Sequence, residues 1–156
     1  MLHEGVAMAG QEYFGPLRDE DAPEGERNYA LLNHLAGLLA LAGGGIPFIG
    51  LIATAVLWRV RHKESPFLDD HGREATNFQI SLLVYVVGGI VAGVVFSIVT
   101  IGIGAPLVAV GAVVGMIFIV VLSLVGCIRG AMAAYRGEFY RYPMCLRWLK
   151  EPEIAH

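Results

Sequence analysis

Two long stretches without a charged side chain constrain this 156-residue sequence more than any other feature. No Asp, Glu, Lys or Arg occurs in the 54 residues between Glu74 and Arg129, or in the 31 residues between Arg27 and Arg59. Charged residues make up only 16% of the chain, against about 25% in an ordinary soluble domain. These proportions exclude a soluble single-domain enzyme, a disordered protein and a secreted disulfide scaffold. They predict an all-α integral membrane protein.

Glycine and proline divide the uncharged stretches into four expected helices. The run Gly43-Gly44-Gly45-Ile46-Pro47 interrupts the first stretch, and the turn at 101–106 interrupts the second. Such clusters end one helix and start the next. We expect a membrane domain over residues 28–136, with transmembrane helices at about 28–43, 46–61, 70–100 and 106–135. The last two can span a bilayer, which takes about 20 residues, whereas the first two are short enough to form a tilted or re-entrant hairpin.

The charged residues outside these helices indicate an orientation. Residues 1–27 are expected to form an acidic mobile tail, and residues 137–156 a basic and aromatic tail at the membrane interface. The segment 59–74 carries four Lys or Arg residues and the segment 129–156 carries five, while the two glycine-rich turns carry none. Because basic residues near span ends favour the cytoplasm, we predict four spans with both termini cytoplasmic. If residues 28–58 instead form one span, the N-terminal tail lies on the opposite side.

Polar side chains gather at the start of the third expected helix and within the first. Uncompensated polar groups are costly in hydrocarbon, so each is expected to have a partner on another helix. The candidate cluster, read as a structural lock or a partner contact, consists of Asn33, His34, His71, Glu74, Asn77 and Gln79. Within it, we expect His34 or Asn33 to lie within hydrogen-bond reach of Glu74, Asn77 or Gln79.

The histidines of this cluster also raise the question of a metal site. The pair His71-x-x-Glu74 resembles part of the site in carboxylate-bridged helix bundles. Those bundles need two such pairs and extra glutamates, and no second histidine accompanies His34 in the apolar stretches. We therefore expect no metal and no cofactor, and we interpret His34 as an interhelical hydrogen-bonding group.

Three small-xxx-small steps allow close contact between helices in lipid. They are Gly89–Gly93, Gly111–Gly115 and Gly126–Gly130. We expect Gly89, Gly93, Gly111 and Gly115 to pack helices within one chain, with Gly111 and Gly115 the most important. The alternative is self-association between copies of the chain.

Several short segments resemble a known family. They are Asn33–Leu38, Pro47–Gly50 running to Trp58, Glu64–Phe67, Asp70–Gln79 and Gly137–Pro143. Together they resemble bacterial four-helix membrane proteins of unknown function that are grouped, by distant similarity, with the Tic-twenty component of chloroplast protein import. The resemblance covers about residues 28–150. It implies a multi-pass protein of the bacterial inner membrane with four helices, and no particular activity.

These features favour a non-enzymatic membrane protein, a small helical-bundle scaffold or assembly subunit. Its expected partners are the lipid bilayer and a second copy or another membrane protein, and no basic stripe indicates nucleic acid. One alternative is a transport, channel or protein-translocation subunit, because broken helices line cavities in transporters. The other is a membrane redox or metal-binding protein that uses His34 and His71.

Overall fold

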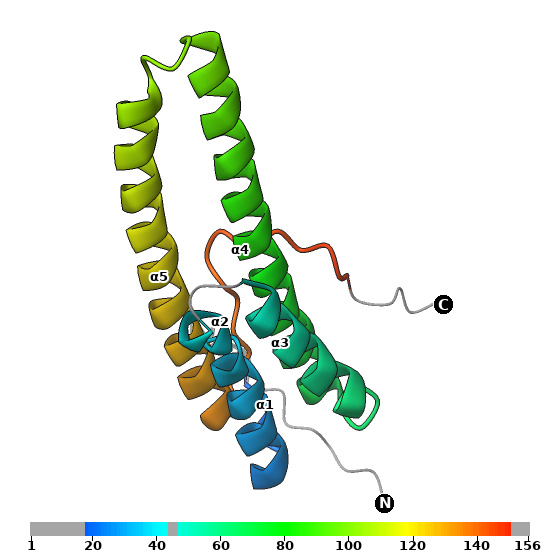
Figure 1. Ribbon diagram of the computed structural model, residues 1–156. Coiled ribbons are helices and arrows are strands. Elements are labelled where there is room, and N and C mark those ends of the chain that lie inside the picture. Colours follow the sequence, from blue (N-terminus) through cyan, green and yellow to red (C-terminus); the bar gives the residue numbers. More distant parts are fainter. Residues whose placement is uncertain (1–17, 44–46, 151–156) are drawn as a thin grey trace, which may run out of the picture.

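The computed structural model describes residues 18–43 and 47–150. These residues form helices α1 (Glu24–Ala36), α2 (Leu39–Ala42), α3 (Pro47–Arg61), α4 (Pro66–Val99) and α5 (Ala105–Tyr135), and no β-strand. In Figure 1, α4 and α5 run side by side as two long helices, with the three shorter helices gathered around their lower halves. The predicted all-helical class is confirmed. Of the five helices, α4 and α5 are long and apolar enough to cross a membrane, while the four spans and their orientation stay predictions.

The longest helix, α4, has two chemically different halves. Ser65 caps its start by accepting a hydrogen bond from the Leu68 N–H at 3.2 Å, and Pro66 occupies the first turn. The helix thus begins before the expected start at 70. Its residues 70–79 are all buried, whereas Ile98 near its other end is 71% exposed. At 34 residues it is about 51 Å long, well beyond the roughly 30 Å of a hydrocarbon core.

The shorter helices reach only part of the way along α4 and α5. Helices α1 and α3 have 13 and 15 residues, about 20 and 22 Å. The first begins at Glu24, directly after Pro23 and with two acidic residues in its first turn. It ends at Ala36, followed by Gly37, which lies so close to α4 that an added Cβ would stand 2.4 Å from Gln79 Nε2. The single turn α2 follows, so the expected helix at 28–43 is divided.

Two expected features lie outside the described residues. One is residues 44–46, the centre of the predicted glycine break, and the other is residues 1–17 of the predicted acidic tail. Of that tail, Arg18 and the start of α1 are described, and Arg18 forms an isolated antiparallel bridge with Glu138.

The C-terminal segment (136–150) turns back after α5 and runs over the helices (Figure 1). The turn uses Gly137 at a φ of +75°, a conformation that glycine adopts without strain. Hydrogen bonds from Arg136, at 2.9 Å, and from Arg18, at 3.0 Å, hold the pKa of Glu138 below its ordinary value. Further along, the ring of Tyr142 stacks on Phe78 of α4 with the ring centroids 4.0 Å apart. In the structure Tyr142 of this segment belongs to the core, whereas Trp148 further along is 65% exposed. The interfacial placement of the tail stays a prediction.

These elements define two regions of the molecule. In the packed end, α1 lies against α4 and α5, α3 lies against α4, and the C-terminal segment completes the core. The apolar hairpin (residues 83–125) is the remaining half of α4 and α5, joined by the turn at 100–104. Its side chains are largely exposed, as Leu107 at 67% illustrates. The polar side chains singled out in the sequence all belong to the packed end.

Candidate functional site

All six residues of the predicted polar cluster are buried in the packed end. None of them is more than 4% exposed: Asn33, His34, His71, Glu74, Asn77 and Gln79. The first two come from α1 and the other four from α4. Burial of polar groups is favourable where they are hydrogen-bonded, but Asn33 Oδ1 and Gln79 Oε1 have no hydrogen-bond partner among the described residues, contrary to expectation. The partners of His34, Glu74 and Asn77 differ from those expected.

A chain of hydrogen bonds links α1, α4 and the C-terminal segment through two histidines. His34 Nε2 lies 2.8 Å from His71 Nδ1, and His34 Nδ1 lies 2.8 Å from the Tyr142 hydroxyl. Burial raises the pKa of Tyr142 well above its ordinary value, so its hydroxyl keeps its proton. A protonated hydroxyl can donate to Nδ1, which leaves His34 Nε2 as the donor to His71.

The first and third predicted helices do meet through a hydrogen bond of His34, but the predicted partner residue is wrong. Glu74, Asn77 and Gln79 are not the hydrogen-bond partners that the structure gives His34; His71 is. The physical reason is that Glu74 and Asn77 are engaged by the C-terminal segment, as the next contacts show. No helical pattern in the sequence marks that segment as a partner.

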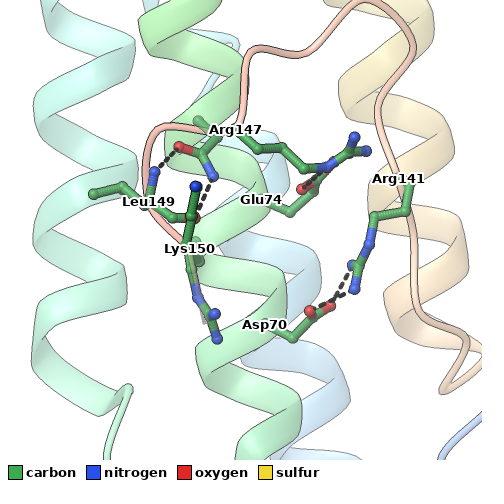
Figure 2. A pocket seen from close by; sticks show the side chains of 8 residues that line it. Asp70, Glu74, Arg141, Arg147, Leu149 and Lys150 are labelled. Carbon is green, nitrogen blue, oxygen red and sulfur yellow. Dashed lines mark hydrogen bonds and ion pairs between the residues drawn. The ribbon is translucent and has the colours of Figure 1, made fainter. Parts of the chain in front are cut away.

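A polar stripe on α4 holds the C-terminal segment. Its residues recur at spacings of three and four, which places them on one helix face: Asp70, Glu74, Asn77, Ser81 and Tyr85. Glu74 accepts from the Tyr142 N–H at 2.9 Å and from the Arg147 guanidinium at 3.1 and 3.2 Å. Asp70 accepts hydrogen bonds from both terminal nitrogens of Arg141, at 2.6 and 2.7 Å (Figure 2).

The rest of the stripe pairs with the backbone of the same segment. Asn77 forms two hydrogen bonds with Leu149, one to the carbonyl at 3.0 Å and one from the N–H at 2.8 Å. Ser81 accepts from the Leu146 N–H at 2.8 Å, and the Tyr85 hydroxyl donates to the Met144 carbonyl at 2.6 Å. Side chains on consecutive turns of α4 thus bind backbone groups of the C-terminal segment that would otherwise form hydrogen bonds with water. Of this stripe, only Glu74 and Asn77 were predicted as site residues. Asp70, Ser81 and Tyr85 were not, although the spacing of three and four residues can be read in the sequence.

The expectation that the four named glycines pack helices within the chain holds for Gly93 and not for the other three. A Cβ added at Gly93 of α4 would lie 2.9 Å from Val108 Cγ1 of α5, whereas one at Gly89, Gly111 or Gly115 would meet nothing within 4 Å. All four glycines line an apolar groove of about 780 Å³ between α4 and α5. Their role in self-association stays a prediction.

The third glycine step is the one that the packed end uses. A Cβ added at Gly126 would lie 3.0 Å from the Tyr142 ring, and one at Gly130 would lie 2.8 Å from His34 Nδ1. Both glycines of α5 therefore make room for the hydrogen-bonded chain of His34 and Tyr142. Close approach of this kind is what small residues provide in membrane helix bundles.

The two histidines required by the metal-binding alternative do lie together. Their facing nitrogens are 2.8 Å apart, whereas two nitrogens bound to one zinc ion at about 2.0–2.1 Å each stand roughly 3.3 Å apart in tetrahedral geometry. Over residues 18–43 and 47–150, no three His, Cys, Asp or Glu side chains are grouped as a metal ion would need. The donor set fits a hydrogen bond between the rings.

Comparison with known proteins corrects the resemblance inferred from the sequence. The model of the MamF/MmsF family, described as the magnetosome magnetite crystal formation protein family, matches residues 25–149. No curated protein and no solved structure matches the chain. The segments that resemble Tic-twenty-like proteins all lie within the matched residues, so that assignment is wrong. Since the match spans most of the chain and all five helices, the chain belongs to the magnetosome magnetite crystal formation protein family.

Proposed function

We propose that this membrane protein acts in magnetite crystal formation as a non-enzymatic scaffold. The observation that carries the proposal is the family match over residues 25–149, which includes the apolar hairpin and the C-terminal segment. In this role the hairpin anchors the protein in the membrane, and the packed end presents a fixed surface beside it. Scaffolding requires a rigid arrangement, and the polar stripe of α4 supplies one.

The proposed placement in the membrane follows from lengths and exposed surfaces. The halves of the hairpin, residues 83–99 of α4 and 105–125 of α5, are about 26 and 32 Å of helix, enough for roughly one bilayer crossing each. Helix α3 exposes an apolar face, with Phe48 at 53%, Ile52 at 61% and Val56 at 55%. An exposed apolar face of this kind marks a contact with the membrane or with another protein. The segment 59–74, with its four Lys or Arg residues, and the C-terminal segment then lie on the cytoplasmic side.

The proposed partner of the hairpin is another membrane helix, from a second copy or a different protein. The groove between α4 and α5 is apolar and is lined by Gly111 and Gly115, whose open faces allow a helix to approach closely. Association through the groove would leave the packed end of each copy at the same membrane face.

The proposed function can be tested by the size and number of the magnetite crystals that a cell forms. In a magnetite-forming bacterium from which its own family member has been deleted, expression of this chain should restore crystal size and number, measured by electron microscopy. A Gly130→Leu variant should fail to restore them, because it disrupts the packed end, and an empty vector sets the baseline. Equal crystals with the chain and with the empty vector, at confirmed membrane expression, would contradict the proposed function.

A further inference from the structure

A polar cavity of about 260 Å³ lies between α4 and the C-terminal segment. Figure 2 shows Arg141 and Arg147 reaching from the segment to carboxylates of α4, with Lys150 close by. Four cationic side chains line the cavity, Arg73, Arg141, Arg147 and Lys150, against the two carboxylates of Asp70 and Glu74. Positive charge therefore exceeds negative charge in the lining, even though Arg73 also pairs with Asp69 beside it.

The excess positive charge is on the outside of the cavity. The side chains of Asp70 and Glu74 are only 11% and 5% exposed, whereas those of Arg141 and Arg147 are each 49% exposed. The carboxylates thus form the floor and hold the two guanidinium groups at the half-exposed rim of the cavity. An approaching ligand meets cations first, and this favours an anion.

Hydrogen-bond donors remain for such an anion. Arg147 binds Glu74 through Nε and Nη2, which leaves Nη1. The Lys150 ammonium has no partner among the residues that the structure describes. A guanidinium edge and an ammonium group are the usual ligands of a phosphate group, the first by directed hydrogen bonds and the second as a point charge.

The cavity lies on the packed end, just outside the apolar hairpin. Its lining residues on α4 run from Asp70 to Asn77, and the exposed apolar side chains of that helix begin at Val84, about 10 Å beyond Asn77. Trp148, between Arg147 and Leu149 in the segment, is 65% exposed, and tryptophan at such a position is typical of the membrane interface. We propose that this cavity binds a phosphate group, supplied by the headgroup of an anionic phospholipid.

The chain allows a direct test because it contains only two lysines, Lys150 at the cavity and Lys63 outside it. The full chain in a neutral maltoside detergent is methylated at its lysines with ¹³C-formaldehyde, which preserves their charge, and is observed by NMR. Dihexanoyl phosphatidylglycerol, dihexanoyl phosphatidylcholine and inorganic phosphate are titrated separately, at ionic strength matched with sodium chloride. A Lys150→Gln sample identifies the signal of each lysine.

We expect phosphatidylglycerol to shift the Lys150 signal to saturation and to leave the Lys63 signal unchanged. Phosphatidylcholine should have a much weaker effect, and a saturable shift with inorganic phosphate alone would instead assign the cavity to free phosphate. In native mass spectrometry, Lys150→Gln should lower phosphatidylglycerol affinity about fivefold, since one surface cation contributes about that much, and Lys63→Gln should not. Equal shifts of both lysines, or no saturable shift with either phosphate source, would overturn the proposal.

Discussion

Gly130→Leu should destabilise the folded chain by about 3 kcal/mol, whereas Gly111→Leu should leave its stability unchanged. At Gly130 even a Cβ would stand 2.8 Å from His34 Nδ1 and 3.1 Å from the Tyr142 hydroxyl, and overpacking of a close-packed core costs about 1–3 kcal/mol or more. At Gly111 an added Cβ meets nothing within 4 Å and the side chain starts into the open groove. Thermal unfolding of both variants in detergent, followed by circular dichroism, checks the difference.

The same pair of variants separates packing within one chain from association between chains. If the groove between α4 and α5 takes a helix of another copy, Gly111→Leu should reduce the oligomer in size-exclusion chromatography at unchanged thermal stability. Equal melting temperatures for Gly130→Leu, Gly111→Leu and the unaltered chain would show that α5 does not pack against α1 and the C-terminal segment as described.

Glu74→Ala should release the C-terminal segment and lower the free energy of unfolding by about 2–3 kcal/mol. The substitution leaves the buried Tyr142 N–H without an acceptor and removes the partner of Arg147, and an unsatisfied buried donor costs about 1–3 kcal/mol. The part due to Arg147 is small because its side chain is half exposed and regains water. Limited trypsin digestion should therefore cut after Arg147 sooner than in the unaltered chain, as mass spectrometry of the fragments would show.

Glu64→Ala provides the matched control for that prediction. Glu64 also binds an arginine, Arg61, through a hydrogen bond of 2.7 Å, but the pair lies on the surface between α3 and α4. Exposed ion pairs contribute little to stability, so this variant should melt and digest like the unaltered chain. If the two glutamate variants release the segment equally slowly, Glu74 does not hold it in place.

The overall fold could be predicted from the sequence because its main signals are local. The charge-free residues between Glu74 and Arg129 indicate two long apolar helices, and the glycine-rich turn before Pro106 separates them. The start of α4 was less certain, since both Ser65-Pro66 and the later aspartates can cap a helix. Starting at Pro66 places His71 more than one turn inside the helix, where it meets His34. From the sequence, His34 and His71 are placed together only in the redox or metal-binding alternative, and not as hydrogen-bond partners.

The contacts of the buried polar residues could not be predicted, because they depend on the irregular C-terminal segment and on how closely the helices approach one another. Five polar residues from Asp70 to Tyr85 share one face of α4, but the segment that they bind has no periodicity to identify it. Three glycine steps look alike in sequence, but a Cβ would be obstructed at both glycines of Gly126–Gly130, at Gly93 alone in the first step, and at neither Gly111 nor Gly115. No local pattern in the sequence distinguishes the groove beside Gly111 and Gly115 from the packed contacts of Gly126 and Gly130.

An engineered disulfide can test directly whether the C-terminal segment is held on the polar stripe of α4. Ser81 Oγ lies 3.9 Å from Cys145 Sγ, so Ser81→Cys in a Cys127→Ala background places two thiols within bonding reach. Ser97→Cys, also on α4 but about 24 Å further along, is the control. After oxidation in membranes, we expect an intramolecular disulfide to Cys145 in the Ser81→Cys chain alone, identified by mass spectrometry of the linked peptides. No such disulfide, or equal linkage in the Ser97→Cys chain, would contradict this placement of the segment.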